Sequence, residues 1–87
     1  MLEYLLMPDD IQWVQGVYLK ERSVNLWIFG RYLYRNYIDT PDWSRVRQYD
    51  VDAVALCGSI VLIKVRNDTY RYDVVNNVVS TRKILKL

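Results

Sequence analysis

Apolar and polar residues alternate most regularly in the last third of the chain, from position 51 to position 87. Three pairs of turn-forming residues divide this segment into four short runs: Gly58-Ser59, Asn67-Asp68 and Asn76-Asn77. Glycine at the first position of a two-residue loop is typical of a tight hairpin, and Asn and Asp tolerate left-handed backbone angles. The pattern predicts a four-stranded antiparallel meander over residues 51–87.

Two-residue turns would also determine which residues of this meander lie opposite one another. Under that register Val54, Ile63 and Tyr72 form one row of an apolar face, which we expect to face the core. The other face carries small side chains at Ala55 and Cys57. We therefore expect a second layer, built from the aromatic N-terminal half, to pack closely against that other face.

Residues 9–38 fit both a strand and a helix. Ile11, Trp13 and Val17 alternate as in a strand, whereas Ile11, Val14 and Tyr18 recur at helical spacing. The richness of this region in aromatic and β-branched residues favours strands. Read as a strand, residues 23–38 place five side chains on one face: Val24, Leu26, Ile28, Tyr32 and Tyr34.

A helix start follows this region at Thr40-Pro41-Asp42. Threonine is a good N-cap, proline suits the first helical position, and an acid there interacts favourably with the helix dipole. We predict a short helix over residues 41–49 that buries Trp43 and Val46. The expected fold class is therefore α+β, with an antiparallel sheet that includes the C-terminal meander, and the alternative is a small, mostly-β barrel.

Length and composition indicate one ordered domain over residues 1–87, with 52% apolar and 25% charged residues. The single cysteine, Cys57, cannot form an intramolecular disulfide, which favours a reducing compartment. The apolar runs are far shorter than the roughly 20 residues that a membrane span needs, and the first residues lack a basic leader. We expect a soluble, intracellular, cytoplasmic protein with no membrane contact.

Catalytic equipment is sparse. The chain has no histidine, the commonest general base, so a cysteine–histidine nucleophile at Cys57 is excluded. Acidic pairs such as Asp9-Asp10 and Asp50 with Asp52 lie where caps or turns are expected. We therefore predict a protein that is not an enzyme and that has no cofactor and no metal site.

The strongest candidate binding site is a basic row on the second face of the meander. The predicted register places Lys64, Arg71 and Arg82 directly opposite one another, with Asp73 one step along. Like charges in that arrangement repel, unless an anionic partner compensates them. We predict that these three residues bind an anionic partner, and the structural alternative is that they extend separately into water.

A weaker candidate lies where arginines alternate with aromatic residues. Tyrosines and arginines interleave between positions 31 and 37, a pattern found on surfaces that stack single-stranded nucleic acid. The predicted helix would add two exposed arginines. The four arginines assigned to this weaker site are Arg31, Arg35, Arg45 and Arg47.

Three functional classes follow from these features. Abundant Tyr, Trp and Arg are typical of interfaces, so we favour a small non-enzymatic binding module whose partner is another protein, of the adaptor or inhibitor type. A nucleic-acid-binding protein that uses a basic sheet face is the second reading, although the net charge is only +2. A homo-oligomeric structural protein, such as a homodimer joined through an edge strand, is the third.

Overall fold

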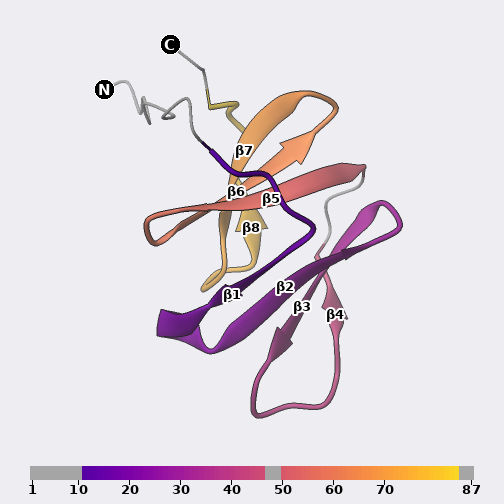
Figure 1. The fold of residues 1–87 in the computed structure, drawn as a ribbon, viewed down its shortest axis with the longest axis vertical. Coiled ribbons are helices and arrows are strands. Elements are labelled where there is room, and N and C mark those ends of the chain that lie inside the picture. The colour runs from indigo at the N-terminus through magenta and orange to yellow at the C-terminus, as the bar shows by residue number, and fades with distance from the viewer. Residues whose placement is uncertain (1–10, 47–49, 85–87) are drawn as a thin grey trace.

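Two antiparallel four-stranded sheets make up nearly the whole fold (Figure 1). The computed structural model describes residues 11–46 and 50–84. The strands of the first sheet, in spatial order, are β1 (Gly16–Leu19), β2 (Val24–Phe29), β3 (Tyr32–Tyr37) and β4 (Ser44–Arg45). Those of the second sheet are β5 (Val51–Cys57), β6 (Ile60–Val65), β7 (Asp68–Asp73) and β8 (Val78–Val79). A short 3-10 turn, η1 (Lys20–Arg22), joins β1 to β2.

The predicted α+β class is wrong, because the described residues contain no α-helix. Where the helix was expected to begin, β4 pairs with β3, and the Val46 N–H donates to the Leu33 carbonyl at 2.8 Å. The Thr40 hydroxyl donates to the Tyr37 carbonyl instead of capping a helix. Pairing with β3 buries Val46 and outweighs the local helix signal. Residues 47–49 of the predicted helix lie outside the described residues. The sheets are open, so the barrel alternative is also incorrect.

The predicted C-terminal meander is present in β5 to β8, but its register agrees in the first hairpin alone. Gly58-Ser59 forms the first turn, and Val54 lies opposite Ile63 as expected. A bulge between Val51 and Ala53 interrupts this pairing near its end.

The second and third turns differ from the prediction. Arg66 and Asn67 form the second turn, with φ of 51° and 73°, so β7 already begins at Asp68. The third turn spans four residues, 74–77, because the Asp73 carboxylate accepts hydrogen bonds from the Val75 and Asn76 N–H groups. Each change moves the pairing by two residues. Because the side-chain period of a strand is also two, the residues of β6 and β7 keep their predicted faces. At the bulge in β5, Val51 and not Asp52 lies opposite Val65 and is buried.

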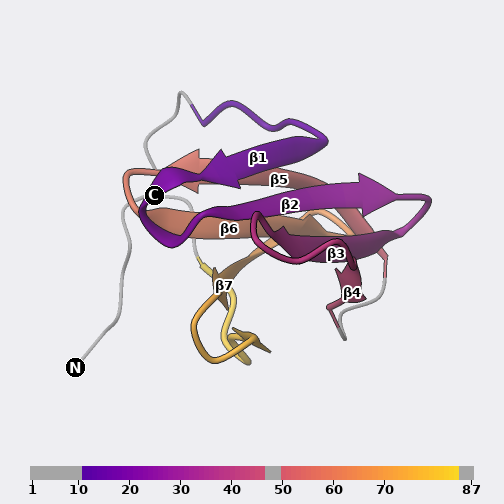
Figure 2. The ribbon, with the colours of Figure 1, turned by 90° about the horizontal axis from the view of Figure 1, so that it is seen from below.

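The core lies between the two sheets (Figure 2). Val54, Ile63 and Tyr72 are buried in it, as predicted, although Tyr70 and not Tyr72 lies opposite Ile63. The first sheet contributes five side chains from its inner face: Leu19, Val24, Leu26, Ile28 and Leu33.

The strands of the N-terminal half therefore pack against the Val54 face, whereas the sequence predicts that they pack on the Ala55 face. Ala55 is nevertheless fully buried, Cys57 is half-buried, and Trp13 contacts Lys64 on that second face.

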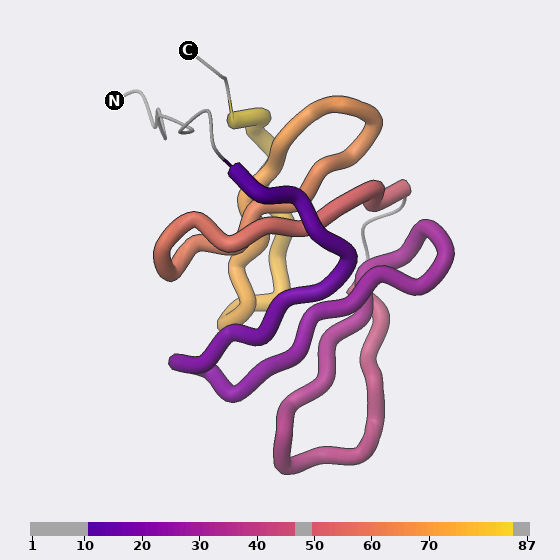
Figure 3. The backbone as a smooth tube through the Cα atoms, in the orientation of Figure 1, coloured from indigo at the N-terminus to yellow at the C-terminus, as the bar shows by residue number. Residues whose placement is uncertain are grey.

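The segment before β1 links the edges of the two sheets. In Figure 3 its indigo trace crosses β5 and then turns back to join β1. Val14 pairs with Val54 through two backbone hydrogen bonds of 2.8 and 2.9 Å, and the Gln15 carbonyl accepts from Ile28 at 2.9 Å. One side of the sandwich is thus closed by main-chain hydrogen bonds. No helix in the described part of the chain is long and apolar enough to cross a membrane.

Candidate functional site

The three predicted basic residues of the second sheet do not form a row. Lys64 lies opposite Thr69, and its ammonium group is 5.8 Å from the centre of the Trp13 ring. Arg71 lies opposite Leu62 on one side, and its N–H donates to the Ser80 hydroxyl on the other. Arg82 lies beyond β8. The two-residue displacement separates the three like charges, and their binding of an anionic partner stays a prediction.

The weaker arginine site is divided among different parts of the fold. Arg31 pairs with Asp50 at 3.0 Å and with Asp52 at 3.3 Å. Asp50 also pairs with Arg66 at 2.8 Å. The hydrogen bonds from Arg66 and Arg31 hold the pKa of the Asp50 carboxyl below its usual range. This cluster ties the β2–β3 turn of the first sheet to the β6–β7 turn of the second.

The other members of the weaker site point in different directions. The Arg35 guanidinium donates to the Val74 carbonyl at 3.3 Å and thereby links the two sheets. Arg45 lies on the outer face of the first sheet, with its guanidinium 4.9 Å from the centre of the Tyr32 ring. Arg47 lies outside the described residues. Of these arginines, Arg45 is the one that the structure places in a candidate interaction surface.

Aromatic side chains dominate the outer face of the first sheet, which points away from the core. Trp27 is 44%, Phe29 54% and Trp43 42% exposed, although burial of large apolar side chains usually stabilises a folded protein. Tyr34 extends the same surface, because it lies opposite Trp27 on β3. We call this surface the aromatic face, and its six members are Tyr18, Trp27, Phe29, Tyr32, Tyr34 and Trp43.

Ring contacts give the aromatic face a defined shape. Phe29 contacts Tyr34 edge to face, with ring centres 5.5 Å apart and an interplanar angle of 71°. It also contacts Trp43, with ring centres 5.8 Å apart at 84°. Trp27 lies over Gly16 on β1, where an added Cβ would come within 2.5 Å of the indole. Such packed rings lose little conformational freedom on binding a partner.

The aromatic face carries very little charge. Among the outward-facing positions of β1 to β4, all of them described, Arg45 is the one charged side chain. Its guanidinium can donate several hydrogen bonds while it stays stacked on Tyr32. The face is therefore an apolar surface with one cationic point.

Sequence reasoning missed the aromatic face because it missed a turn. Reading residues 23–38 as one strand placed Tyr32 and Tyr34 with Leu26. A hairpin turn at Gly30-Arg31, with a Gly30 φ of 64°, instead places Tyr32 opposite the outward-facing Phe29. The glycine between two apolar runs is the signal that could have revealed this turn.

The described residues contain no group of three or more His, Cys, Asp or Glu that could hold a metal ion. Comparisons of the chain with protein-family models, with curated proteins and with solved structures found no match. The candidate site therefore depends on the physical character of the aromatic face.

Proposed function

We propose that this protein is a small non-enzymatic binding module, of the adaptor or inhibitor type, that recognises another protein through its aromatic face. The observation that carries the proposal is the exposure of Trp27, Phe29 and Trp43 on one face of the first sheet. Exposed clusters of large apolar side chains are uncommon on monomeric proteins and mark interaction surfaces. Trp, Tyr and Arg are also the residues that contribute most often to interface hot spots.

Charge indicates what the partner presents. The aromatic face has a cation at Arg45 and no carboxylate on its strand ladder. The complementary surface is therefore apolar and carries an Asp or Glu that can accept hydrogen bonds from the guanidinium. The outward-facing strand positions of a second copy would supply no such acid, which favours a different protein as the partner.

The same charge pattern disfavours nucleic acid on this face. Nucleic-acid affinity depends on several phosphate contacts, whereas the face supplies one cation. Its perpendicular ring pairs also differ from a series of open ring faces on which successive bases could stack. Binding at Lys64, Arg71 and Arg82 is a separate possibility that the experiment below distinguishes.

The test compares partner capture by four forms of the full chain in the cytoplasmic extract of the native host. The forms are the wild type, the double variant Phe29→Ser with Trp43→Ser, the charge reversal Arg45→Glu, and a control that removes exposed apolar groups elsewhere, Leu56→Ser with Val78→Ser. Captured proteins are identified by mass spectrometry, and the affinity of each purified partner is then measured by calorimetry. We expect a partner that binds the wild type and the control, and that loses at least about tenfold in affinity for the other two variants.

Three results would contradict the proposal. The first is a purified partner that binds the Phe29→Ser, Trp43→Ser variant as tightly as it binds the wild type. The second is salt-sensitive retention of nucleic acid that disappears when Arg71 and Arg82 are reversed in charge, which would support the nucleic-acid reading. The third is a concentration-dependent dimer in sedimentation that the double variant abolishes, which would support a homo-oligomer.

A further inference from the structure

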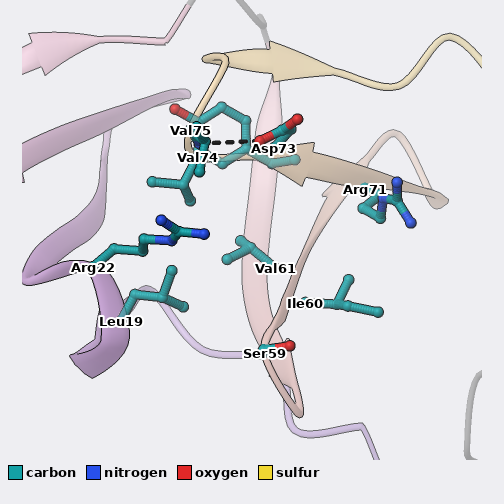
Figure 4. Close-up of a pocket in the computed structure, with 10 residues that line it drawn as sticks. Leu19, Arg22, Ser59, Ile60, Val61, Arg71, Asp73, Val74 and Val75 are labelled. Carbon is teal, nitrogen blue, oxygen red and sulfur yellow. Dashed lines mark hydrogen bonds between the residues drawn. The ribbon is translucent and has the colours of Figure 1, made fainter.

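A pocket of about 260 Å³ opens between the β1–β2 connection and the second sheet (Figure 4). Leu19 and Arg22 line it from the first sheet, and the start of β6 lies across from them. Val74 and Val75, in the turn between β7 and β8, close a further side. No member of the aromatic face lines this pocket, so it is a separate site.

The shifted register of the second sheet creates this space. The pairing of β6 with β7 ends at Val61 and Tyr72, so Ile60, the first residue of β6, has no partner on β7. The wide turn at 74–77 therefore leaves the beginning of β6 without a neighbouring strand on that side. The walls are partly apolar, with Leu19, Val61 and Val74 among the lining residues, and partly polar, with Ser59, Asp73 and two arginines.

The Arg22 side chain places a positive charge beside the apolar residues of the pocket. Figure 4 shows its side chain extending from the first sheet toward Val61 and Val74. Among the described residues, no ion pair or side-chain hydrogen bond involves the Arg22 guanidinium. Its five donors are available to a ligand at the mouth of the pocket.

The acid that lines the pocket does not neutralise Arg22. Asp73 uses Oδ1 to accept from the Val75 and Asn76 N–H groups, at 3.0 and 3.2 Å, and Oδ2 to accept from the Asn76 amide at 2.8 Å. The hydrogen bonds of this carboxylate therefore lie within the β7–β8 turn, and none of them involves Arg22. Arg71 also lines the pocket, with its guanidinium pointing away from Arg22 in Figure 4. Arg22 is therefore the charged side chain of the lining that extends toward Val61 and Val74.

We propose that this pocket binds a small carboxylate with a short apolar tail, whose head group pairs with Arg22 and whose tail packs on Leu19, Val61 and Val74. A guanidinium matches a carboxylate through two parallel hydrogen bonds. The volume lies just below that of drug-sized ligand sites, so the ligand is small. Such a group occurs in free aliphatic acids and at the C-terminus of a peptide that ends in an aliphatic residue.

The test is a titration of the ¹⁵N-labelled full chain, followed by NMR. The probes are sodium hexanoate, hexanol, hexylammonium, and acetyl-Ala-Val with either a free or an amidated C-terminus. We expect hexanoate to shift the amide signals of Val61, Tyr72 and Val74 with a dissociation constant on the order of 1 mM. Arg22→Gln weakens this binding at least about tenfold, whereas the control Lys20→Gln, which removes an exposed cation outside the pocket, leaves it unchanged.

Each outcome has a definite meaning. Tighter binding of the peptide with a free C-terminus than of hexanoate identifies a peptide terminus as the ligand, and the reverse order identifies a free acid. Equal binding of hexanol and hexanoate, unchanged affinity in a folded Arg22→Gln variant, or no shifts up to about 10 mM overturns the proposal. If Arg22→Gln does not fold, Arg22→Lys replaces it, with weaker but measurable binding expected. Because the two sites share no residue, these results are independent of the test of the aromatic face.

Discussion

Gly16 is the residue that allows the Trp27 indole to lie flat over β1. A Cβ at position 16 would meet three ring atoms at 2.5 to 2.8 Å, closer than non-bonded atoms approach. Gly16→Ala should therefore displace the ring and lower the free energy of unfolding by about 1–3 kcal/mol, as overpacking usually does. Urea denaturation, with near-ultraviolet circular dichroism to follow the indole, measures both effects.

A double-mutant cycle supplies the control for this prediction. In a Trp27→Ala background the steric conflict is absent, and the Gly16→Ala change should cost close to nothing. An equal cost in both backgrounds would show that the indole is not what excludes a side chain at position 16.

Asp50 gives the protein a defined response to acid. Hydrogen bonds from Arg66 and Arg31 lower its pKa in the folded state below the ordinary value of 3.8. The folded state therefore binds fewer protons at this group than the unfolded state does, so stability is present above about pH 4 and is lost as the pH falls through the folded pKa. Asp50→Asn should remove this part of the pH dependence, measured as the change in urea midpoint between about pH 6 and about pH 2.

Asparagine is the suitable substitution there because position 50 has a φ of 58°, which Asn adopts more readily than most residues. Asp73, whose pKa is also lowered by the hydrogen bonds of its turn, should retain its own acid response in the variant. The interpretation fails if wild type and Asp50→Asn lose the same stability over this pH range.

At the scale of elements, the β6–β7 turn decides the register of the second half of the meander. Arg66 and Asn67 occupy the left-handed region, whereas Asp68 belongs to β7 and lies opposite Val65. Asn67→Gly should therefore be neutral or stabilise by up to about 0.5 kcal/mol, because glycine suits a positive φ. Asp68→Gly should cost about 1 kcal/mol, since it introduces glycine into a paired strand and removes the ion pair with Lys83.

Thermal unfolding of the two variants tests this register directly. If the turn consisted of Asn67 and Asp68, glycine would be tolerated equally at both positions. Similar stabilities of the two variants would thus contradict the observed pairing of Val65 with Asp68.

At the scale of the whole molecule, one core joins the two sheets. Leu26 and Leu33 of the first sheet are fully buried in the same cluster as Val54 and Ile63 of the second. Leu33→Ala should cost about 2–5 kcal/mol and should reduce hydrogen-exchange protection in both sheets together. Leu56→Ala, at a side chain that is 39% exposed, is the control and should cost less than about 1 kcal/mol. Persistent protection of β6 while β2 and β3 exchange would show instead that the sheets unfold independently.

The aromatic face and the Arg22 pocket also belong to this scale, because both form where elements distant in sequence meet. Phe29 and Trp43 come from β2 and from the segment before β4, and the pocket joins η1 to the β7–β8 turn. Little of the candidate site was therefore predictable. The sequence shows that these residues are aromatic or basic, but strand pairing decides which of them lie together on one surface.

The sequence by itself determined which residues of β6 and β7, and which residues of β5 after its bulge, lie on the core side of the sheet. Alternation has a period of two, and errors of two residues in the second and third turns left Val54, Ile63 and Tyr72 buried. The turn at Gly58-Ser59 was also predictable, because glycine marks it locally.

The tertiary structure alone decided the rest. Thr40-Pro41-Asp42 has the local features of a helix start, yet pairing of β4 with β3 and burial of Val46 outweigh them. Lys64 and Arg71 lie apart because Arg66 and Asn67, not Asn67 and Asp68, form the β6–β7 turn. Arg71 and Arg82 lie apart because hydrogen bonds to the Asp73 carboxylate widen the β7–β8 turn. Propensity and alternation act over a few residues, whereas pairing partners and packed faces depend on the free energy of contacts between distant segments.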